Sequence, residues 1–106
     1  MKSSAAALFA ALGDETRLRI VVRLAEGAPL SISRLVDGTT LTRQAITKHL
    51  HVLEGARLIR GARQGRERLW ELNPRRLAEA RRALDRIANE WDARLLRLKE
   101  TLEEKD

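Results

Sequence analysis

The fold is decided by residues 41–53, which read Leu41-Thr42-Arg43-Gln44-Ala45-Ile46-Thr47-Lys48-His49-Leu50-His51-Val52-Leu53. Ile46, Leu50 and Leu53 recur at helical spacing and predict one apolar face, and Thr42 suits the N-cap because its hydroxyl can accept a backbone N–H bond. The other face carries side chains that commonly contact DNA bases and phosphates, namely Thr42, Arg43, Gln44, Thr47, Lys48 and His51. A solvated surface helix is the alternative, and the surrounding sequence decides between the two.

Positive charge is concentrated in and just after this segment. The chain of 106 residues has a formal net charge of +6. Residues 41–70 hold seven Lys or Arg against two Asp or Glu, a balance of +5, whereas residues 71–106 hold nine of each sign. A solvated face mixes the two signs more evenly, so the concentration favours a surface that binds a polyanion such as double-stranded DNA.

Three short helices are predicted before residue 41. Ser3 or Ser4 can cap a helix through Leu12, and Gly13 ends it. Asp14 can cap a second helix that reaches about Glu26, and Ser31 can open a third that ends at Val36 and buries Leu35 and Val36. The second helix is expected to face inward with Leu18, Val21, Val22 and Ala25. The turn at residues 37–40 then leads into the polar-faced helix, which is the arrangement of a helix-turn-helix.

Two short strands are predicted after residue 57. Residues 58–63 and 66–72 flank Gln64-Gly65, a two-residue turn whose glycine can take positive φ. The expected fold is therefore mainly α with a small β-hairpin, a winged helix-turn-helix. Arginines at a hairpin tip can enter a minor groove, so the expected wing contacts are Arg63, Gln64, Arg66 and Arg68. A solvated hairpin is the alternative. Trp70 is expected to anchor the core.

Residues 74–106 read as one long helix, with Asn73 as N-cap and Pro74 at the first helical position. Leu84, Trp91 and Leu98 recur every seven residues, and such a stripe extends beyond what one small domain can cover. We expect residues 1–106 to form a single domain that pairs as a homodimer through this helix and the first one; folding of the stripe back onto its own core is the alternative. The expected interface residues are Leu8, Phe9, Leu12, Leu84, Ile87, Trp91, Leu95 and Leu98.

Three segments together carry a family resemblance: residues 11–20 (ALGDETRLRI), residues 41–50 and residues 65–70 (GRERLW). They resemble the ArsR/SmtB family of bacterial winged-helix repressors, the arsenic-repressor and metal-sensor family, over about residues 5–102. The resemblance implies a homodimer that binds an imperfect palindrome near its own promoter. It places the DNA contacts on the recognition-helix and wing residues named above.

The chain departs from the family pattern at the metal sites and after the recognition helix. Ser31 and Ser33 stand where founding members carry a Cys-x-Cys pair, and hydroxyls do not hold soft metals. Residues 74–106 contain no His for a zinc site, and His49 and His51 project about 200° apart on a helix, so they cannot chelate one ion. We therefore expect no metal and no cofactor. Arg57 replaces the usual glycine before Leu58, so either the helix ends at Gly55 or Arg57 takes an uncommon conformation and adds a phosphate contact.

Other classes of protein are less well supported. The sequence has no cysteine, no phosphate-binding glycine loop and no paired carboxylates in an apolar setting, so we expect no enzyme activity. A protein-interaction module with an incidental basic face is the main alternative. We expect no membrane segment and a bacterial cytoplasmic, nucleoid-associated location. A small apolar molecule or a protein is a possible effector, expected at the dimer interface around Trp91; regulation without any ligand is the alternative.

Overall fold

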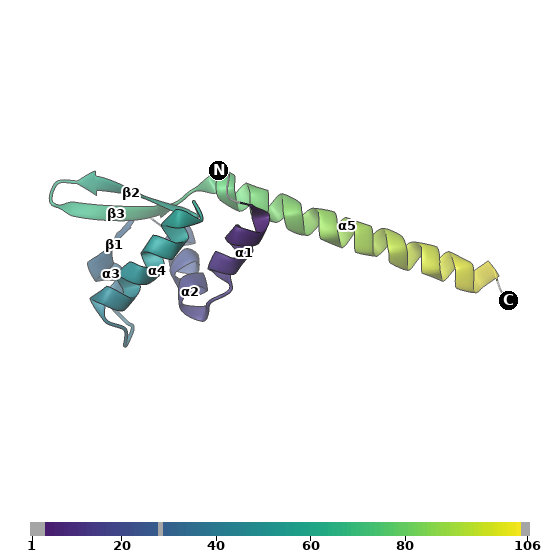
Figure 1. Cartoon of the computed structure of the whole chain (residues 1–106), viewed down its shortest axis with the longest axis horizontal. Coiled ribbons are helices and arrows are strands. Elements are labelled where there is room, and N and C mark those ends of the chain that lie inside the picture. The colour runs from purple at the N-terminus through teal and green to yellow at the C-terminus, as the bar shows by residue number, and fades with distance from the viewer. Residues whose placement is uncertain (1–3, 28, 105–106) are drawn as a thin grey trace.

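The computed structural model describes residues 4–27 and 29–104. Figure 1 shows a body of short helices and strands from which one long helix extends, and the molecule measures 70 × 31 × 24 Å. The elements, in chain order, are α1 (Ala5–Leu12), α2 (Glu15–Ala25), β1 (Leu30–Ser31), α3 (Ile32–Val36), α4 (Arg43–Gly55), β2 (Ile59–Gln64), β3 (Glu67–Leu72) and α5 (Pro74–Glu104). The fold is mainly helical with a winged helix-turn-helix, as predicted.

The helix starts are where the sequence placed them. Ser4, Asp14, Ser31 and Thr42 each accept a hydrogen bond from the backbone N–H three residues later. The alternative first cap, Ser3, lies outside the described residues. Each side chain satisfies a donor that would otherwise be unpaired in the first helical turn, so local chemistry fixes all four starts.

The inward face of α2 differs from the prediction. Ile20, Val21 and Leu24 are buried, whereas Leu18 and Val22 are each 48% exposed, and Ala25 is exposed as well. The helix is rotated so that Ile20, Val21 and Leu24 join the core, and half-buried Arg17 donates from its guanidinium to the backbone carbonyl of Ala11. The packing partners of α2 therefore decide the rotation that the hydrophobic pattern left open.

The sheet has a third strand that the sequence did not predict. Antiparallel β1 pairs with β3, with Leu30 opposite Trp70, and the strand order is β1-β3-β2. The hairpin turn is also one residue later than predicted: Gln64 pairs with Glu67, so Gly65 and Arg66 are the two turn residues. Gly65 has φ +64°, a conformation that glycine adopts without steric cost.

The end of α4 answers the question raised by Arg57. The helix runs to Gly55 with Ala56 as C-cap, and Arg57 is left-handed with φ 66°. The N–H of Arg57 donates to Glu54 O at 2.9 Å and that of Leu58 donates to Leu53 O at 3.0 Å. These two bonds form a Schellman motif in which an arginine occupies the position that usually holds glycine.

The core lies between the helices and the inner face of the sheet. Its completely buried large side chains are Leu8, Leu35, Ile46, Leu50, Leu53, Leu58 and Ile59. Leu35 is buried as predicted while Val36 is only half-buried, and Trp70, 5% exposed, anchors the core as predicted. Leu8, predicted to contact a second subunit, is 0% exposed, so its side chain is already covered within its own chain.

Helix α5 begins at Pro74, as predicted, and Asn73 O accepts the N–H of Leu77. The side-chain amide of Asn73 donates to Arg57 O at 3.1 Å instead of capping the helix. Only the first turns of α5 pack on the body, where Arg76, Ala80 and Ala83 are buried. Residues 105 and 106, predicted to end this helix, lie outside the described part of the chain. Within the described part, no helix is long and apolar enough to cross a membrane.

Candidate nucleic-acid interface

The predicted DNA-reading residues share one outward face of α4. Ile46, Leu50 and Leu53 are buried on the inner side, and one open hollow on the outer side is lined by Arg43, Gln44, Thr47, Lys48 and His51. Thr42 precedes them as the N-cap, accepting from Ala45 N at 3.1 Å. The sequence pattern therefore identified a face on which five polar side chains lie together.

Thr47 differs from the other members of this face. It is half-buried, and its hydroxyl donates to the carbonyl of Arg43, four residues earlier, at 2.8 Å. Its proton is therefore already used, and only its oxygen remains as an acceptor. Arg43, Gln44, Lys48 and His51 are exposed, so they present the donors of this surface.

The wing, residues 59–72 of β2, β3 and their turn, comes close to this face of α4. A cleft of about 350 Å³ lies between α3, α4 and the wing, and Arg43 and His51 of α4 line it together with Arg63, Arg66 and Arg68 of the wing. Gln64 is exposed in the strand that leads into the turn. The fold thus brings polar side chains of α4 together with arginines of the wing that lie 12 to 25 positions later in the sequence.

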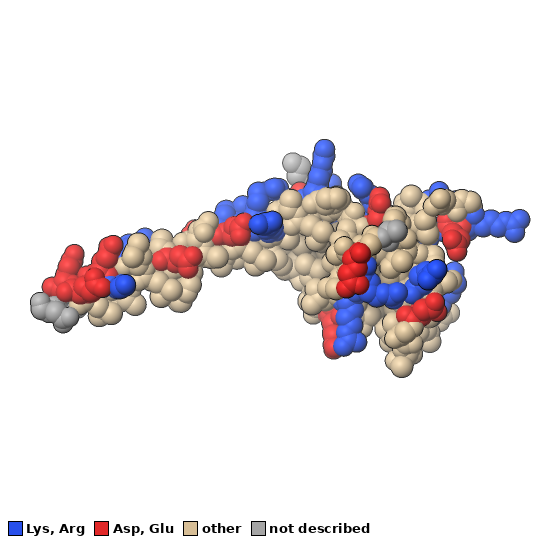
Figure 2. Space-filling model, turned by 180° about the vertical axis from the view of Figure 1, so that it is seen from behind, with Lys and Arg blue, Asp and Glu red and all other residues tan. Residues whose placement is uncertain are grey.

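The charges of this surface differ in how far they are neutralised. Within residues 4–27 and 29–104, no carboxylate lies within 4.0 Å of the charged groups of Arg43, Lys48, Arg63 or Arg66, whereas Arg68 is paired with Glu54 at 3.1 Å. Figure 2 shows Lys and Arg side chains projecting from the end of the molecule that carries the hairpin, while both signs occur along α5. The uncompensated charge therefore lies where a polyanion would contact α4 and the wing.

The back of α4 is held by a polar cluster at the corner between α1 and α2. Half-buried His49 lies with its Nδ1 3.3 Å from Nη1 of Arg17 and 3.8 Å from Oδ2 of Asp14. The Arg17 backbone N–H, which donates to Asp14 at 3.0 Å, is the main cause that lowers the pKa of the Asp14 carboxyl, and the charges of Arg17 and His49 act in the same direction. His49 thus supports the recognition helix from behind, while His51 is exposed on the outer face.

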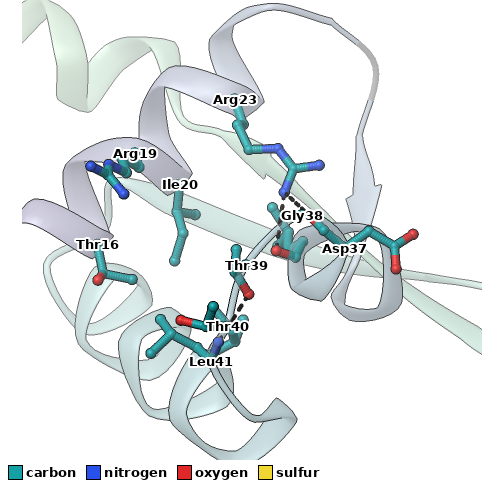
Figure 3. Close-up of a pocket in the computed structure, with 11 residues that line it drawn as sticks. Thr16, Arg19, Ile20, Arg23, Asp37, Gly38, Thr39, Thr40 and Leu41 are labelled. Carbon is teal, nitrogen blue, oxygen red and sulfur yellow. Dashed lines mark hydrogen bonds between the residues drawn. The ribbon is translucent and has the colours of Figure 1, made fainter.

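The loop that leads into α4 is fixed from α2. Figure 3 shows Arg23 reaching across to the start of this loop. Its guanidinium donates to the carbonyls of Arg34 at 2.9 Å and Leu35 at 3.0 Å, in the last turn of α3, and to that of Asp37 at 3.5 Å, where the loop begins. Thr39 donates to Val36 O at 2.8 Å and accepts the N–H of Leu41 at 3.3 Å. A hollow of about 430 Å³ remains between α2 and the loop. These bonds set where α4 begins relative to the body.

The predicted dimer residues of α5 are all uncovered in the single chain. Leu84, Ile87, Trp91, Leu95 and Leu98 are between 46% and 63% exposed. In α1, Phe9 and Leu12 are half-buried against the core.

Across the described residues, no group of three or more His, Cys, Asp or Glu is placed to hold a metal ion.

Known helix-turn-helix regulators are similar to this chain. A family profile described as a helix-turn-helix domain matches residues 12–62. The chain is 43% identical over 77 residues to the HTH-type transcriptional regulator Rv2034 of Mycobacterium tuberculosis. The aligned residues cover 73% of this chain and 71% of that relative. It is 33% identical over 86 residues to the HTH-type transcriptional repressor SmtB of the same species. Here the aligned residues cover 81% of this chain and 62% of that relative.

A solved structure agrees over most of the length. An ArsR-like transcriptional regulator from Rhodococcus sp. RHA1 superposes with a TM-score of 0.78 and 40% identity, covering 91% of this chain and 90% of that one. The similarity extends through the wing and into the long helix, beyond the helix-turn-helix alone. The chain is therefore a DNA-binding transcriptional regulator and not an enzyme, and it belongs to the ArsR/SmtB family of winged helix-turn-helix proteins.

Proposed function

We propose that this chain is a homodimeric repressor that binds an imperfect palindrome near its own promoter. The observation that carries the proposal is the cleft in which α4 and the wing meet, because it combines base-reading and phosphate-binding side chains on one surface. The similarity to the repressor SmtB supports repression as the outcome of binding.

In this proposal α4 enters the major groove. Gln44 and Arg43 are exposed near its N-terminus, and their side chains can make bidentate hydrogen bonds to adenine and guanine edges. Lys48 and His51 follow on the same face, and with Thr42 and Thr47 they complete the contact surface. Arg63, Gln64 and Arg66 contact the DNA backbone or the adjoining minor groove from the wing.

The dimer supplies the two-fold symmetry of the proposed site. The far part of α5 extends from the body with its apolar stripe uncovered (Figure 1), and an apolar stripe with seven-residue spacing is best covered by a second helix of the same kind. Two copies of α4 would then read half-sites about one helical turn, about 34 Å, apart. Phe9 and Leu12 of α1 extend this interface.

We place the binding site of a small apolar effector at this dimer interface. Trp91 is 59% exposed and is the one aromatic side chain in an otherwise aliphatic stripe, so a small apolar molecule could bind against it. A thermal-shift screen checks this: a ligand that binds the folded dimer raises its unfolding temperature. A ligand whose effect survives replacement of Trp91 by Leu would exclude that location.

The function is tested by binding of the purified protein to DNA upstream of its own gene, with random competitor DNA and over a series of salt concentrations. We expect competitor-resistant binding that the double variant Arg43→Ala, Gln44→Ala abolishes. The matched control is Arg81→Ala, Asn89→Ala, which removes the same chemical groups from exposed positions on α5. Upstream binding no tighter than that to random DNA would contradict the proposed operator. Equal loss of binding in both variants would show a general effect of charge, and an activity that the Arg43→Ala, Gln44→Ala variant keeps would favour a protein-interaction surface.

A further inference from the structure

Arg68 is oriented differently from the other arginines of the wing. It lies on β3 opposite Arg63, two residues before Trp70 and on the same face of the sheet. Its Nη2 donates to Oε2 of Glu54 at 3.1 Å, and its Cζ lies 4.6 Å from the centroid of the Trp70 ring. The side chain therefore connects the wing to the last turn of α4.

Gly61 on the neighbouring strand leaves room for this path. It pairs directly with Trp70, and a Cβ added to Gly61 would lie 2.5 Å from Nε of Arg68 and 3.0 Å from a carbon of the Trp70 ring. No real side chain can approach that closely, so any other residue at position 61 would displace the guanidinium. The absence of a side chain at Gly61, the ring of Trp70 and the carboxylate of Glu54 together hold Arg68 in one place.

We propose that Arg68 is a positioning residue, which together with Gly61 and Glu54 forms a wing clamp that fixes the angle between the wing and α4. The proposal rests on the proposed function and replaces the DNA contact that the sequence predicted for Arg68, because Arg68 then does not neutralise a phosphate. Glu54 already compensates its charge, whereas Arg63 and Arg66 have no carboxylate within 4.0 Å in the described part of the chain.

A clamp of this kind affects specific binding more than non-specific binding. Pairing with β1 ends at Leu69, so the wing beyond it has only the two strands β2 and β3. Such a hairpin is marginally stable by itself and needs contacts with the rest of the domain to hold one orientation. Specific recognition requires α4 and the wing to reach their places on the DNA together, whereas non-specific binding depends mainly on total charge. Loosening the wing should therefore lower the ratio of specific to non-specific affinity.

The variant Glu54→Gln distinguishes a phosphate-binding role of Arg68 from a positioning role, because the two predict opposite changes in specific DNA affinity. It removes a negative charge beside a polyanion, so electrostatics alone would strengthen all DNA binding. The wing clamp predicts instead that specific affinity falls about two- to fivefold, as expected for loss of one exposed ion pair, while non-specific affinity is unchanged or rises. Arg68→Gln should lower specific affinity similarly, and the double variant should be no worse than either single one.

The salt dependence tests directly whether Arg68 contacts a phosphate. Loss of one phosphate contact lowers the slope of log affinity against log salt by about 0.9. We expect Arg68→Gln to leave this slope unchanged. The matched control is Glu71→Gln, which breaks the other exposed arginine–carboxylate pair of the sheet, Arg60 with Glu71 at 2.9 Å, and should not reduce specific affinity.

A measurement without DNA separates this inference from the proposed function. Alternate residues of the edge strand β2 direct their amide hydrogens toward β3. In the intact chain, the amide hydrogens of Ala62 and Gln64 should exchange faster in Glu54→Gln and in Arg68→Gln than in Glu71→Gln. If no specific DNA binding is found at all, the proposed function fails and the exchange rates still decide whether the wing clamp exists. Unchanged exchange, tighter specific binding by Glu54→Gln or a slope lowered by about 0.9 in Arg68→Gln would each overturn it.

Discussion

Arg76, in the first turn of α5, donates a hydrogen bond from Nη2 to the backbone carbonyl of Ser4, 3.0 Å away in space and 72 residues away in the chain. The same guanidinium donates from Nε to the carbonyl of Ala56, the C-cap of α4, at 2.8 Å. It is also paired with Glu79, and only 3% of Arg76 is exposed. One buried side chain thus joins the start of α1, the end of the recognition helix and the proposed dimerisation helix.

Replacement of Arg76 by Met should destabilise the fold strongly. Met fills a similar volume but leaves the buried contact at the Ala56 carbonyl and the part-buried one at the Ser4 carbonyl without their charged donor, and we expect the free energy of unfolding to fall by about 2–4 kcal/mol. Urea denaturation at one fixed protein concentration measures this. The control is Arg75→Met, at the exposed neighbouring position, for which we expect a change below about 0.5 kcal/mol. Equal stability of the two variants would contradict the role assigned to Arg76.

Replacement of Arg57 by Gly should stabilise the protein. A non-glycine residue in the left-handed region costs about 1–2 kcal/mol, and part of that gain is offset by the greater freedom of glycine in the unfolded chain, so we expect about 0.5–1 kcal/mol. Arg57→Ala is the informative comparison because it removes the charge but keeps the Cβ. If Ala stabilises as much as Gly in urea denaturation, the backbone conformation is not the cause.

Sequence reasoning succeeded where the interactions are local. The four N-caps and the apolar face of α4 depend on residues three or four positions apart, and all are found as predicted. It failed where distant partners decide. The two-residue β1 exists because Trp70 and Leu69 pair with it, and the rotation of α2 follows the core that Ile20, Val21 and Leu24 share with residues of other elements.

In the candidate site, too, the local features could be predicted from the sequence and the features that depend on distant residues could not. The outward residues of α4 follow from helical periodicity alone. The different role of Arg68 could not be predicted, because it depends on Glu54, 14 positions earlier, and on the register that places Gly61 opposite Trp70. One signal was present in the sequence, namely a glycine within a predicted strand, which often marks a close approach of another group.

The stability of α2 should depend on pH through Asp14. Its pKa is lowered in the folded protein, chiefly by the backbone N–H of Arg17, so the charged form stabilises the fold. That contribution is complete above the ordinary pKa of aspartate, about 4, and is lost as pH falls through the lowered value.

The variant Asp14→Asn tests this because asparagine can accept the same backbone bond without a charge. The wild type should be the more stable of the two at pH 7, and the difference should shrink as the pH falls below about 4. Urea denaturation of both proteins over this range measures the effect. A difference that stays constant down to pH 3 would show that charge is not involved.

The proposed dimer can be tested at two adjacent leucines of α5. Leu95 is 46% exposed and lies on the stripe with Trp91, whereas Leu96 is 57% exposed but is turned about 100° away from it. Leu95→Glu should produce monomers at micromolar concentration in sedimentation experiments, because it places a charge in an apolar interface. Leu96→Glu should remain dimeric. Equal behaviour of the two variants would contradict this interface.

The central claim is that α4 reads bases while the wing arginines bind phosphates, and a comparison of Gln44→Ala with Arg66→Gln tests it most directly. Affinity for the upstream DNA and for random DNA is measured for both variants over a series of salt concentrations. We predict that Gln44→Ala weakens only specific binding and leaves the salt slope unchanged, and that Arg66→Gln weakens both and lowers the slope by about 0.9. A Gln44→Ala protein that still distinguishes the upstream DNA as well as the wild type does would contradict the account.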